Sequence, residues 1–340
     1  MVLALEKQWI WDSWYAHDGH RWHGFFLKAD KSLINPELRH FNVTQGHAVS
    51  DDLVSWEHLG TFFAPSETAA WDDFTTWTGS VVADDAGLWH LFYTGARKAE
   101  DGLYQRIGHA TSTDLHNWTR IGAAPCLDLT GPNAMHYEAD HIRGVWHDRA
   151  MRDPWVMRDP DGPGWVMYFT ARAPGIDEPN AGGAIGFATS PDLATWTLRP
   201  PIFIGGFGQL EVPQVFEAGG RWYCLFCTAA AHWSKERADA TPGGPVTGTH
   251  YLMSDAGPRG PWAVAPGPFF DGELPCRRYA ARILDTGTGP GDGPENGLVI
   301  MGFRDTAENG HFGGYVMDPE PVTIDRNGLL HVRRDARAVE

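Results

Sequence analysis

Short apolar stretches alternate with turns rich in Gly, Pro and Asp along the whole sequence, and no long segment shows helical periodicity. In five places two such stretches flank a single turn, which is the pattern of a β-hairpin. The predicted hairpins cover residues 12–27, 78–93, 153–170, 211–228 and 280–303. A third apolar stretch follows each of them, so the pattern predicts an all-β protein.

A seven-residue motif, Ser-x-Asp-Leu-x-x-Trp, follows three of the hairpins at residues 50–56, 112–118 and 190–196, and a weaker copy lies at 251–262. We expect its Ser and Asp to bond the backbone amides of a turn and its Trp to anchor the next strand. Copies roughly 60 to 80 residues apart are typical of four-stranded blades arranged around a channel. The sequence therefore predicts a five-bladed β-propeller that forms a single domain, residues 1–340.

The composition narrows the range of partners. A net charge of −16 argues against nucleic acid and anionic membranes, because both require a basic surface. No apolar run reaches transmembrane length and no secretory signal is visible, so we expect a cytoplasmic protein. Cys224 and Cys227 match the C-x-x-C spacing of redox and zinc sites. They lie in an apolar strand, where residues three apart face opposite sides, so we interpret them as buried structural thiols.

Three acidic residues share one position in this pattern. Asp12, Asp153 and Glu211 each lie at the start of the first strand of a predicted hairpin. If the hairpins repeat around an axis, the three carboxyl groups converge at one end of it. Cleavage of a glycosidic bond needs one carboxylic acid to protonate the leaving oxygen and a second carboxylate as nucleophile or base. Each acid also has a purely structural alternative, such as a turn cap or a partner for a neighbouring Arg, and their shared position favours function.

The segments around these acids resemble glycoside hydrolase families 32 and 68, the invertases, fructanases and levansucrases, and more distantly family 43. The resemblance covers essentially the whole chain, in order. The segments that carry it are Trp11-Asp12-Ser13-Trp14, Gly46-His47-Ala48-Val49-Ser50, Trp77-Thr78-Gly79-Ser80, Arg152-Asp153-Pro154 and Glu211-Val212-Pro213.

The resemblance implies a catalytic role for each acid. Asp12 would be the nucleophile, Glu211 the general acid and base, and Asp153 a carboxylate that grips sugar hydroxyls and stabilises the transition state. The implied substrate-binding residues are Trp11, Trp77, Thr78 and Arg152. The sequence departs from family 32 in three ways: the Asn-Asp-Pro-Asn segment around the nucleophile is absent, Val212 follows the acid/base Glu, and we expect no C-terminal β-sandwich.

The leading functional hypothesis is a retaining glycoside hydrolase that acts on β-fructofuranosides through a covalent glycosyl-Asp12 intermediate, with transfer to another acceptor left open. Two alternatives also remain open: an inverting, family 43-like arabinofuranosidase or xylosidase, and a non-catalytic propeller that binds a sugar or a protein. We expect a small sugar or oligosaccharide as the partner and neither a metal nor another cofactor. The cluster at residues 136–141, which includes His136 and His141, lacks the geometric constraint that a metal site needs.

The proposed division of work predicts how the acids ionise. Glu211 should have the highest pKa of the three, because nearby carboxylates favour its neutral form. Thr78 or Ser80 should donate a hydrogen bond to Asp12, and Arg152 should hold Asp153 in its ionised form.

Overall fold

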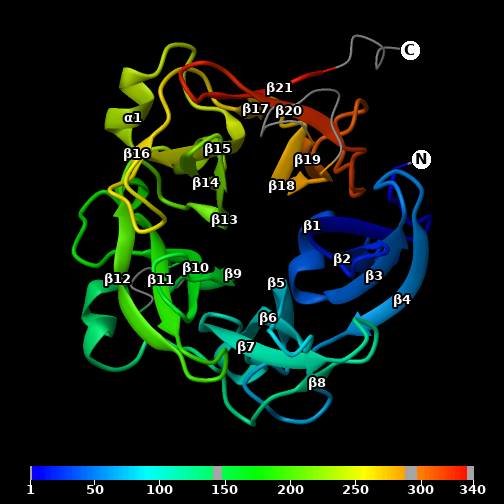
Figure 1. The fold of residues 1–340 in the computed structure, drawn as a ribbon. Coiled ribbons are helices and arrows are strands. Elements are labelled where there is room, and N and C mark those ends of the chain that lie inside the picture. The colour runs from blue at the N-terminus through cyan, green and yellow to red at the C-terminus, as the bar shows by residue number, and fades with distance from the viewer. Residues whose placement is uncertain (1, 141–147, 288–296, 335–340) are drawn as a thin grey trace.

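The computed structural model describes residues 2–140, 148–287 and 297–334, and these residues form five antiparallel sheets arranged radially around one axis (Figure 1). The first sheet consists of β1 (Gln8–His17), β2 (Trp22–Asp30), β3 (Thr44–Ser50) and β4 (Glu57–Phe63). The second consists of β5 (Thr75–Ala83), β6 (Trp89–Ala96), β7 (Gln105–Ser112) and β8 (Thr119–Arg120). The third consists of β9 (Met151–Arg158), β10 (Trp165–Arg172), β11 (Gly183–Ser190) and β12 (Thr197–Ile204).

The fourth sheet consists of β13 (Glu211–Ala218), β14 (Arg221–Thr228), β15 (Thr247–Ser254), β16 (Ala263–Val264) and β17 (Asp271–Glu273), and the last strand pairs with β15. The fifth consists of β18 (Arg278–Asp285), β19 (Leu298–Arg304), β20 (Glu320–Ile324) and β21 (Leu330–Val332). The short helices are η1 (Lys31–Leu33), η2 (Pro36–Phe41), η3 (Lys98–Glu100), η4 (Pro132–His136), η5 (Pro179–Ala181), η6 (Ala230–His232) and α1 (Lys235–Ala240). The predicted five-bladed β-propeller is confirmed.

The first strand of every blade lies nearest the axis, so β1, β5, β9, β13 and β18 surround the centre of the ring (Figure 1). The ring closes where the first blade meets the fifth. Leu3 forms an antiparallel bridge with Val316, and the Ile10 amide donates to the Gly314 carbonyl at 2.8 Å. Leu3, Ile10 and Val316 are buried in one apolar cluster that joins the two blades. Hydrophobic contact between the first and last blades therefore holds the ring shut.

The repeated Ser-x-Asp-Leu-x-x-Trp motif forms the same turn in three blades. In the first copy, Asp52 accepts hydrogen bonds from the Val54 and Ser55 amides, and the Trp56 indole N–H donates to the Leu53 carbonyl at 3.0 Å. The other copies repeat these contacts, with indole bonds of 3.1 and 3.0 Å. The Leu of each copy is buried and has a positive φ of 63° or 64°. The predicted turn is confirmed, and each Trp bonds back to the Leu carbonyl within it.

The glycine that precedes each motif copy has a packing function. Gly46, Gly108 and Gly186 pair across the sheet with Phe26, Tyr93 and Phe169. A Cβ atom added at any of the three would lie 2.2–2.3 Å from the paired aromatic ring. The aromatic ring thus lies directly over the glycine, in the space that any larger residue would need.

Two further predictions concern the interior and the surface. Cys224 and Cys227 are both buried, free thiols that pack in different hydrophobic clusters, as expected for residues that face opposite sides of a strand. Within the described ranges, the structure has no helix that combines the length and apolarity needed to cross a bilayer.

Candidate active site

A β-bulge near the start of each inner strand positions the candidate site. In β1 the bulge lies between Trp11 and Ser13, and in β5 it lies between Trp77 and Gly79. In β9, β13 and β18 the register shifts just after Arg152, Glu211 and Tyr279. A bulge leaves one residue without a cross-strand partner and turns its side chain out of the regular pleat. Because the five bulges occupy equivalent places, the side chains around them meet at one end of the axis.

The bulges create two rings of residues. One ring consists of the residues just before the bulges, which are Trp11, Trp77, Arg152, Glu211 and Tyr279. The other ring consists of the bulge residues themselves, which are Asp12, Thr78, Asp153, Val212 and Ala280. The expectation that all three acids share one position is therefore wrong in detail. Asp12 and Asp153 are bulge residues, whereas Glu211 lies one residue earlier, because Val212 takes the bulge position in β13. Asp153, Val212 and Ala280 have positive φ values of 56°, 53° and 48°.

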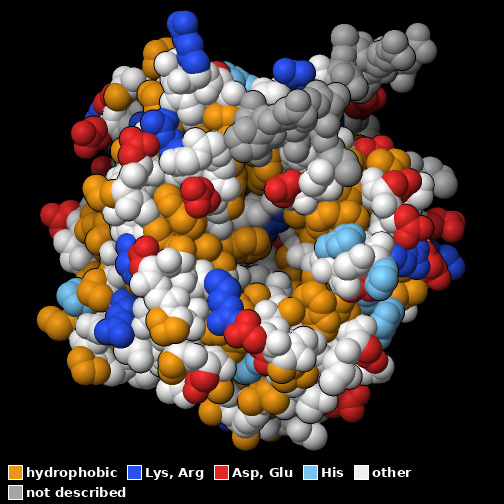
Figure 2. All heavy atoms as spheres, viewed as in Figure 1, with side chains coloured by type: hydrophobic (Ala, Val, Ile, Leu, Met, Phe, Trp, Pro, Cys, Tyr) orange, Lys and Arg blue, Asp and Glu red, His pale blue; other side chains and the backbone are white. Residues whose placement is uncertain are grey.

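A cavity of about 370 Å³ is lined by residues of both rings. The space-filling view shows the centre of the molecule hollowed (Figure 2). All seven residues singled out from the sequence line this cavity: Trp11, Asp12, Trp77, Thr78, Arg152, Asp153 and Glu211. The sequence thus predicted a set of residues that the fold brings together from four blades.

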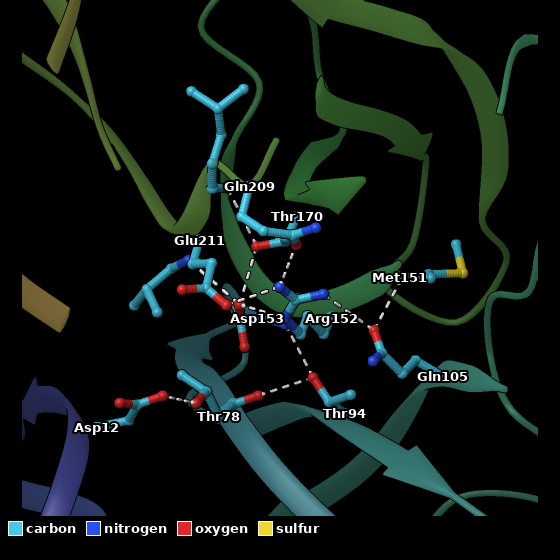
Figure 3. Close-up of polar contacts among 12 residues, drawn as sticks. Asp12, Thr78, Thr94, Gln105, Met151, Arg152, Asp153, Thr170, Gln209 and Glu211 are labelled. Atoms are coloured by element: carbon cyan, nitrogen blue, oxygen red, sulfur yellow. Dashed lines mark hydrogen bonds and ion pairs between the residues drawn. The ribbon is translucent and has the colours of Figure 1, made fainter. Parts of the chain in front are cut away.

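Asp12 is bound to the neighbouring blade through Thr78. The Thr78 hydroxyl donates to Asp12 Oδ2 at 2.5 Å, and the Thr78 carbonyl accepts from the Thr94 hydroxyl at 3.1 Å (Figure 3). The predicted donor to Asp12 is therefore Thr78, while the Ser80 hydroxyl accepts from the Val156 amide instead. Burial and the negative charge of Asp153 raise the pKa of Asp12 to about 7, against the effect of the Thr78 hydrogen bond.

Asp153 is held by neutral donors. Its Oδ2 accepts from the Thr170 hydroxyl at 2.8 Å and from the Val212 amide at 3.2 Å. Its own amide donates to the Thr94 hydroxyl at 2.8 Å, so one threonine links the Asp12 side of the site to the Asp153 side. Burial raises the pKa of Asp153 above its ordinary value, and the nearby Arg152 charge opposes this rise.

Arg152 pairs most closely with Glu211 rather than with Asp153. Its Nη2 lies 2.7 Å from Glu211 Oε1 and also donates to Gln209 at 2.5 Å, whereas its Nε lies 3.5 Å from Asp153 Oδ2 (Figure 3). The Tyr279 hydroxyl donates to Glu211 Oε2 at 2.5 Å. Both carboxylate oxygens of Glu211 therefore accept a strong hydrogen bond.

These contacts correct the expected order of acidities. Burial by itself raises the pKa of Glu211, but the Arg152 charge and the hydrogen bonds from Tyr279 and Arg152 outweigh burial and hold that pKa below its ordinary value. Asp12, with a pKa of about 7, is the weaker acid. The prediction that Glu211 has the highest pKa of the three is thus wrong, because the Arg152 cation is directed at Glu211.

Several residues that line the cavity were missed from the sequence, among them Tyr279, Arg39 and Asp305. Tyr279 lies just before the predicted fifth hairpin, in the position of Trp11 in the first blade, so the blade register was a signal that could have found it. Arg39 and Asp305 also line the cavity. They lie on irregular segments after β2 and β19, where no repeat fixes the position of a side chain.

Two residues of the cluster considered for metal binding are accounted for in different ways. Glu138 forms an ion pair with Arg172 at 2.7 Å, and His141 belongs to the segment that the structure does not describe. In the part of the chain that is described, no three His, Cys, Asp or Glu side chains are grouped in a way that could hold a metal ion. The absence of a metal requirement stays a prediction.

Comparison with known proteins finds a family whose model matches this chain. The family model described as "Glycosyl hydrolases family 32 N-terminal domain" matches residues 12–245. Sucrose-6-phosphate hydrolase of Escherichia coli is 28% identical over 215 residues, which are 61% of this chain and 38% of that protein. The chain thus spans less than half of the length of this relative.

Solved structures share the fold at low identity. An inulosucrase from Halalkalicoccus jeotgali bound to kestose superposes with a TM-score of 0.74 at 21% identity, covering 96% of this chain and 87% of that chain. A thermostable family-43 glycoside hydrolase superposes with a TM-score of 0.68 at 15% identity, covering 98% and 96%. The match to the family model covers more than half of the chain. The chain therefore belongs to the glycosyl hydrolase family 32, through its N-terminal, propeller-forming domain.

Proposed function

We propose that this protein is a retaining glycoside hydrolase that acts on β-fructofuranosides such as sucrose or fructo-oligosaccharides. The observation that carries the proposal is the meeting of Asp12, Asp153 and Glu211 in one cavity, each with a distinct set of hydrogen-bond partners. Membership of family 32 supports the same chemistry. The matched relatives are much longer than the matched segment, so the activity, substrate and partners are our inference from this site.

The proposed reaction has two steps. In the first, the Asp12 carboxylate attacks the anomeric carbon of the fructosyl unit, and Glu211 donates its proton to the glycosidic oxygen of the departing sugar. In the second, Glu211 takes a proton from water, and the resulting hydroxide attacks the fructosyl carbon and releases Asp12. Asp153 accepts hydrogen bonds from sugar hydroxyls, and Trp11 and Trp77 form apolar walls around the ring.

The pKa shifts of the two acids run opposite to what the first step needs. Asp12 has the higher pKa, although it must be ionised to attack, and Glu211 is stabilised as a carboxylate, although it must donate. The two groups share one cavity and are electrostatically coupled, so their protons are lost as a pair. We infer that sugar hydroxyls compete for the Arg152 and Tyr279 donors, which raises the pKa of Glu211 and moves the proton to it.

The wider predictions follow from the same assignment. We take residues 1–340 as one catalytic domain, with a soluble sugar as the partner of the cavity. A cytoplasmic location remains a prediction from the sequence. Neither a transferase reaction nor hydrolysis is favoured by the geometry, since both proceed through the same glycosyl-Asp12 intermediate.

A substrate panel tests the proposal. The purified protein is incubated with sucrose, inulin-type and levan-type oligosaccharides, and aryl α-L-arabinofuranosides, and the products are separated and identified. We expect free fructose or fructosyl-transfer products, and their loss in the Asp12→Asn variant. Release of arabinose without fructose would favour the family 43-like alternative, and no release from any substrate would favour a binding protein.

A further inference from the structure

The cavity continues from the acids toward a rim made by connecting segments of three blades. Arg39 lies on η2 between β2 and β3, His232 lies on η6 after β14, and Asp305 follows β19. These segments belong to the first, fourth and fifth blades, which are neighbours in the ring (Figure 1). Glu211 also comes from the fourth blade. A leaving group that Glu211 protonates therefore departs beside this part of the rim.

Arg39 is a fixed side chain in this wall. Only 8% of its surface is exposed, and its Nη1 donates to the Pro36 carbonyl at 2.9 Å and to Glu37 at 3.2 Å. Its guanidinium also lies 4.2 Å from the centre of the Phe312 ring, on the fifth blade. The guanidinium lies 5.6 Å from the centre of the Trp11 ring as well. Its hydrogen bonds use Nη1, and Nη2 has no hydrogen-bond partner among the residues described. A planar, immobilised guanidinium with a free donor edge is suited to bind sugar hydroxyls.

The charges around Arg39 are already balanced by protein carboxylates. Glu37 is its ion-pair partner, and the negative charges of Asp12 and Asp305 also act on it. Across the whole cavity wall, five carboxyl groups stand against two arginines and His232; the second arginine pairs with Glu211, and the His232 charge also acts on Glu211. Burial lowers the pKa of His40 to about 3, so this histidine adds no charge at neutral pH. A phosphate entering the cavity would meet more negative than positive charge, even with Asp12 protonated.

We propose that Arg39 and Asp305 form a leaving-group site that binds the hydroxyls of an uncharged sugar and excludes phosphorylated sugars. This inference rests on the proposed function and assigns the substrate class at the same site. Arg39 supplies donors and Asp305 supplies an acceptor, and both line the same cavity. The excess of carboxylates over cations in the cavity wall discriminates between the two kinds of sugar. It repels a dianionic phosphate group and leaves neutral hydroxyls unaffected.

Sucrose and sucrose phosphorylated on the glucose 6-hydroxyl are a matched substrate pair for the test. We expect kcat/KM of the wild-type protein to favour sucrose by at least about 100-fold. Asp305→Asn removes one negative charge and should reduce that preference about tenfold. Arg39→Lys keeps the charge but loses the planar fork, so KM for sucrose should rise about tenfold while kcat changes little. Asp51→Asn, which removes an exposed carboxylate outside the cavity, is the control and should leave the preference unchanged.

An aryl β-D-fructofuranoside, which has no second sugar, separates this inference from the proposed function. Cleavage of the aryl substrate together with a preference for the phosphorylated sugar would overturn the leaving-group site alone. The same holds if Asp305→Asn leaves the preference at the wild-type value. Failure to cleave the aryl substrate and sucrose would refute the proposed function, and this inference with it.

Discussion

Glu211 and Asp12 lie in the same cavity, yet their environments shift their acidities in opposite directions. Asp12 has one short hydrogen bond, from Thr78, and burial dominates its behaviour. Glu211 accepts from Arg152 and Tyr279, and these donors outweigh burial. The number and charge of the donors, rather than depth alone, therefore determine which of the two carboxyl groups has the higher pKa.

The Tyr279 hydroxyl is a positioning group whose removal should change the pH profile. In Tyr279→Phe the carboxylate of Glu211 loses one donor, so its pKa rises. Glu211 has the lower pKa of the coupled pair, and the acidic limb of the kcat/KM profile reports that lower value. The limb should therefore move to higher pH by roughly one unit, the equivalent of one charge-assisted hydrogen bond. Tyr137→Phe, which removes a hydroxyl bonded to the Arg199 carbonyl, is the matched control and should leave the limb in place. An acidic limb that stays fixed in Tyr279→Phe would show that Tyr279 does not tune Glu211.

Asp12 should also make stability depend on pH. Its native pKa of about 7 lies above the ordinary value of 3.8, so between these values the native state binds more protons than the unfolded state. Stability contributed by this group is therefore lost as pH rises through that window. The Asp12→Asn variant has no carboxyl group to titrate at this position, so its stability does not fall in this window. The difference between its free energy of unfolding and that of wild type should therefore increase from pH 4 to pH 8, by at most about 4 kcal/mol.

Urea unfolding at the two pH values measures this difference. Asp114→Asn is the contrasting variant, because hydrogen bonds from the Asn117 amide and side chain lower the pKa of Asp114 below its ordinary value of 3.8. Asp114 is therefore ionised in both states across this window, and the stability of Asp114→Asn relative to wild type should change little between pH 4 and pH 8. An Asp12→Asn variant whose relative stability does not change with pH would contradict the raised pKa.

At the scale of the element, the bulge and the glycine–aromatic pair are the repeated devices of the blade. Gly108 is a suitable test, because an added Cβ would lie 2.3 Å from the Tyr93 ring. Gly108→Ala should lower the free energy of unfolding by about 1–3 kcal/mol, the usual cost of overpacking. Gly162→Ala, where the nearest atom would lie 3.4 Å away, should change it by less than about 0.5 kcal/mol. Equal effects of the two substitutions in chemical denaturation would refute the packing role.

The regular elements could be predicted from the sequence because each is encoded locally. Alternating apolar residues and Gly-rich turns fix a hairpin, and the Ser-x-Asp-Leu-x-x-Trp turn is formed by hydrogen bonds within seven residues. The bulges are not encoded in this way. A bulge shifts the register by one residue. Glu211 therefore occupies in β13 the position that Trp11, and not Asp12, occupies in β1. The ion pair between Arg152 and Glu211 depends on two strands from different blades, so no local pattern predicts it.

At the scale of the whole molecule, the ring depends on the contact between its first and last blades. Leu3 is 4% exposed and packs with Val316 of the fifth blade, whereas Val2 is 40% exposed. Leu3→Ala should destabilise the protein by about 2–4 kcal/mol, because it leaves a cavity at the closing contact. Val2→Ala should have little effect on the thermal midpoint. A midpoint for Leu3→Ala within 1 °C of wild type would show that the ring closes without this contact.

The whole-molecule architecture also explains why the candidate residues could be found although they are up to 199 positions apart in the sequence. The inner strands of all five blades surround the axis (Figure 1), and residues near their starts line one cavity. Recognising the repeat was therefore sufficient to bring Asp12, Asp153 and Glu211 together. The rim residues Arg39, His232 and Asp305 lie outside the repeat, in connections of different length and conformation, and only the three-dimensional structure places them.

Asp12 is the residue that we propose forms a covalent bond to the fructosyl unit. The direct measurement uses Glu211→Gln with an activated aryl β-D-fructofuranoside, whose leaving group needs no proton, so that the first step proceeds and the second is slow. After an acid quench and protease digestion, mass spectrometry should find one added hexosyl group on the peptide that contains Asp12. An adduct on the peptide that contains Asp153, or steady release of the aryl group with no adduct on any peptide, would contradict the account.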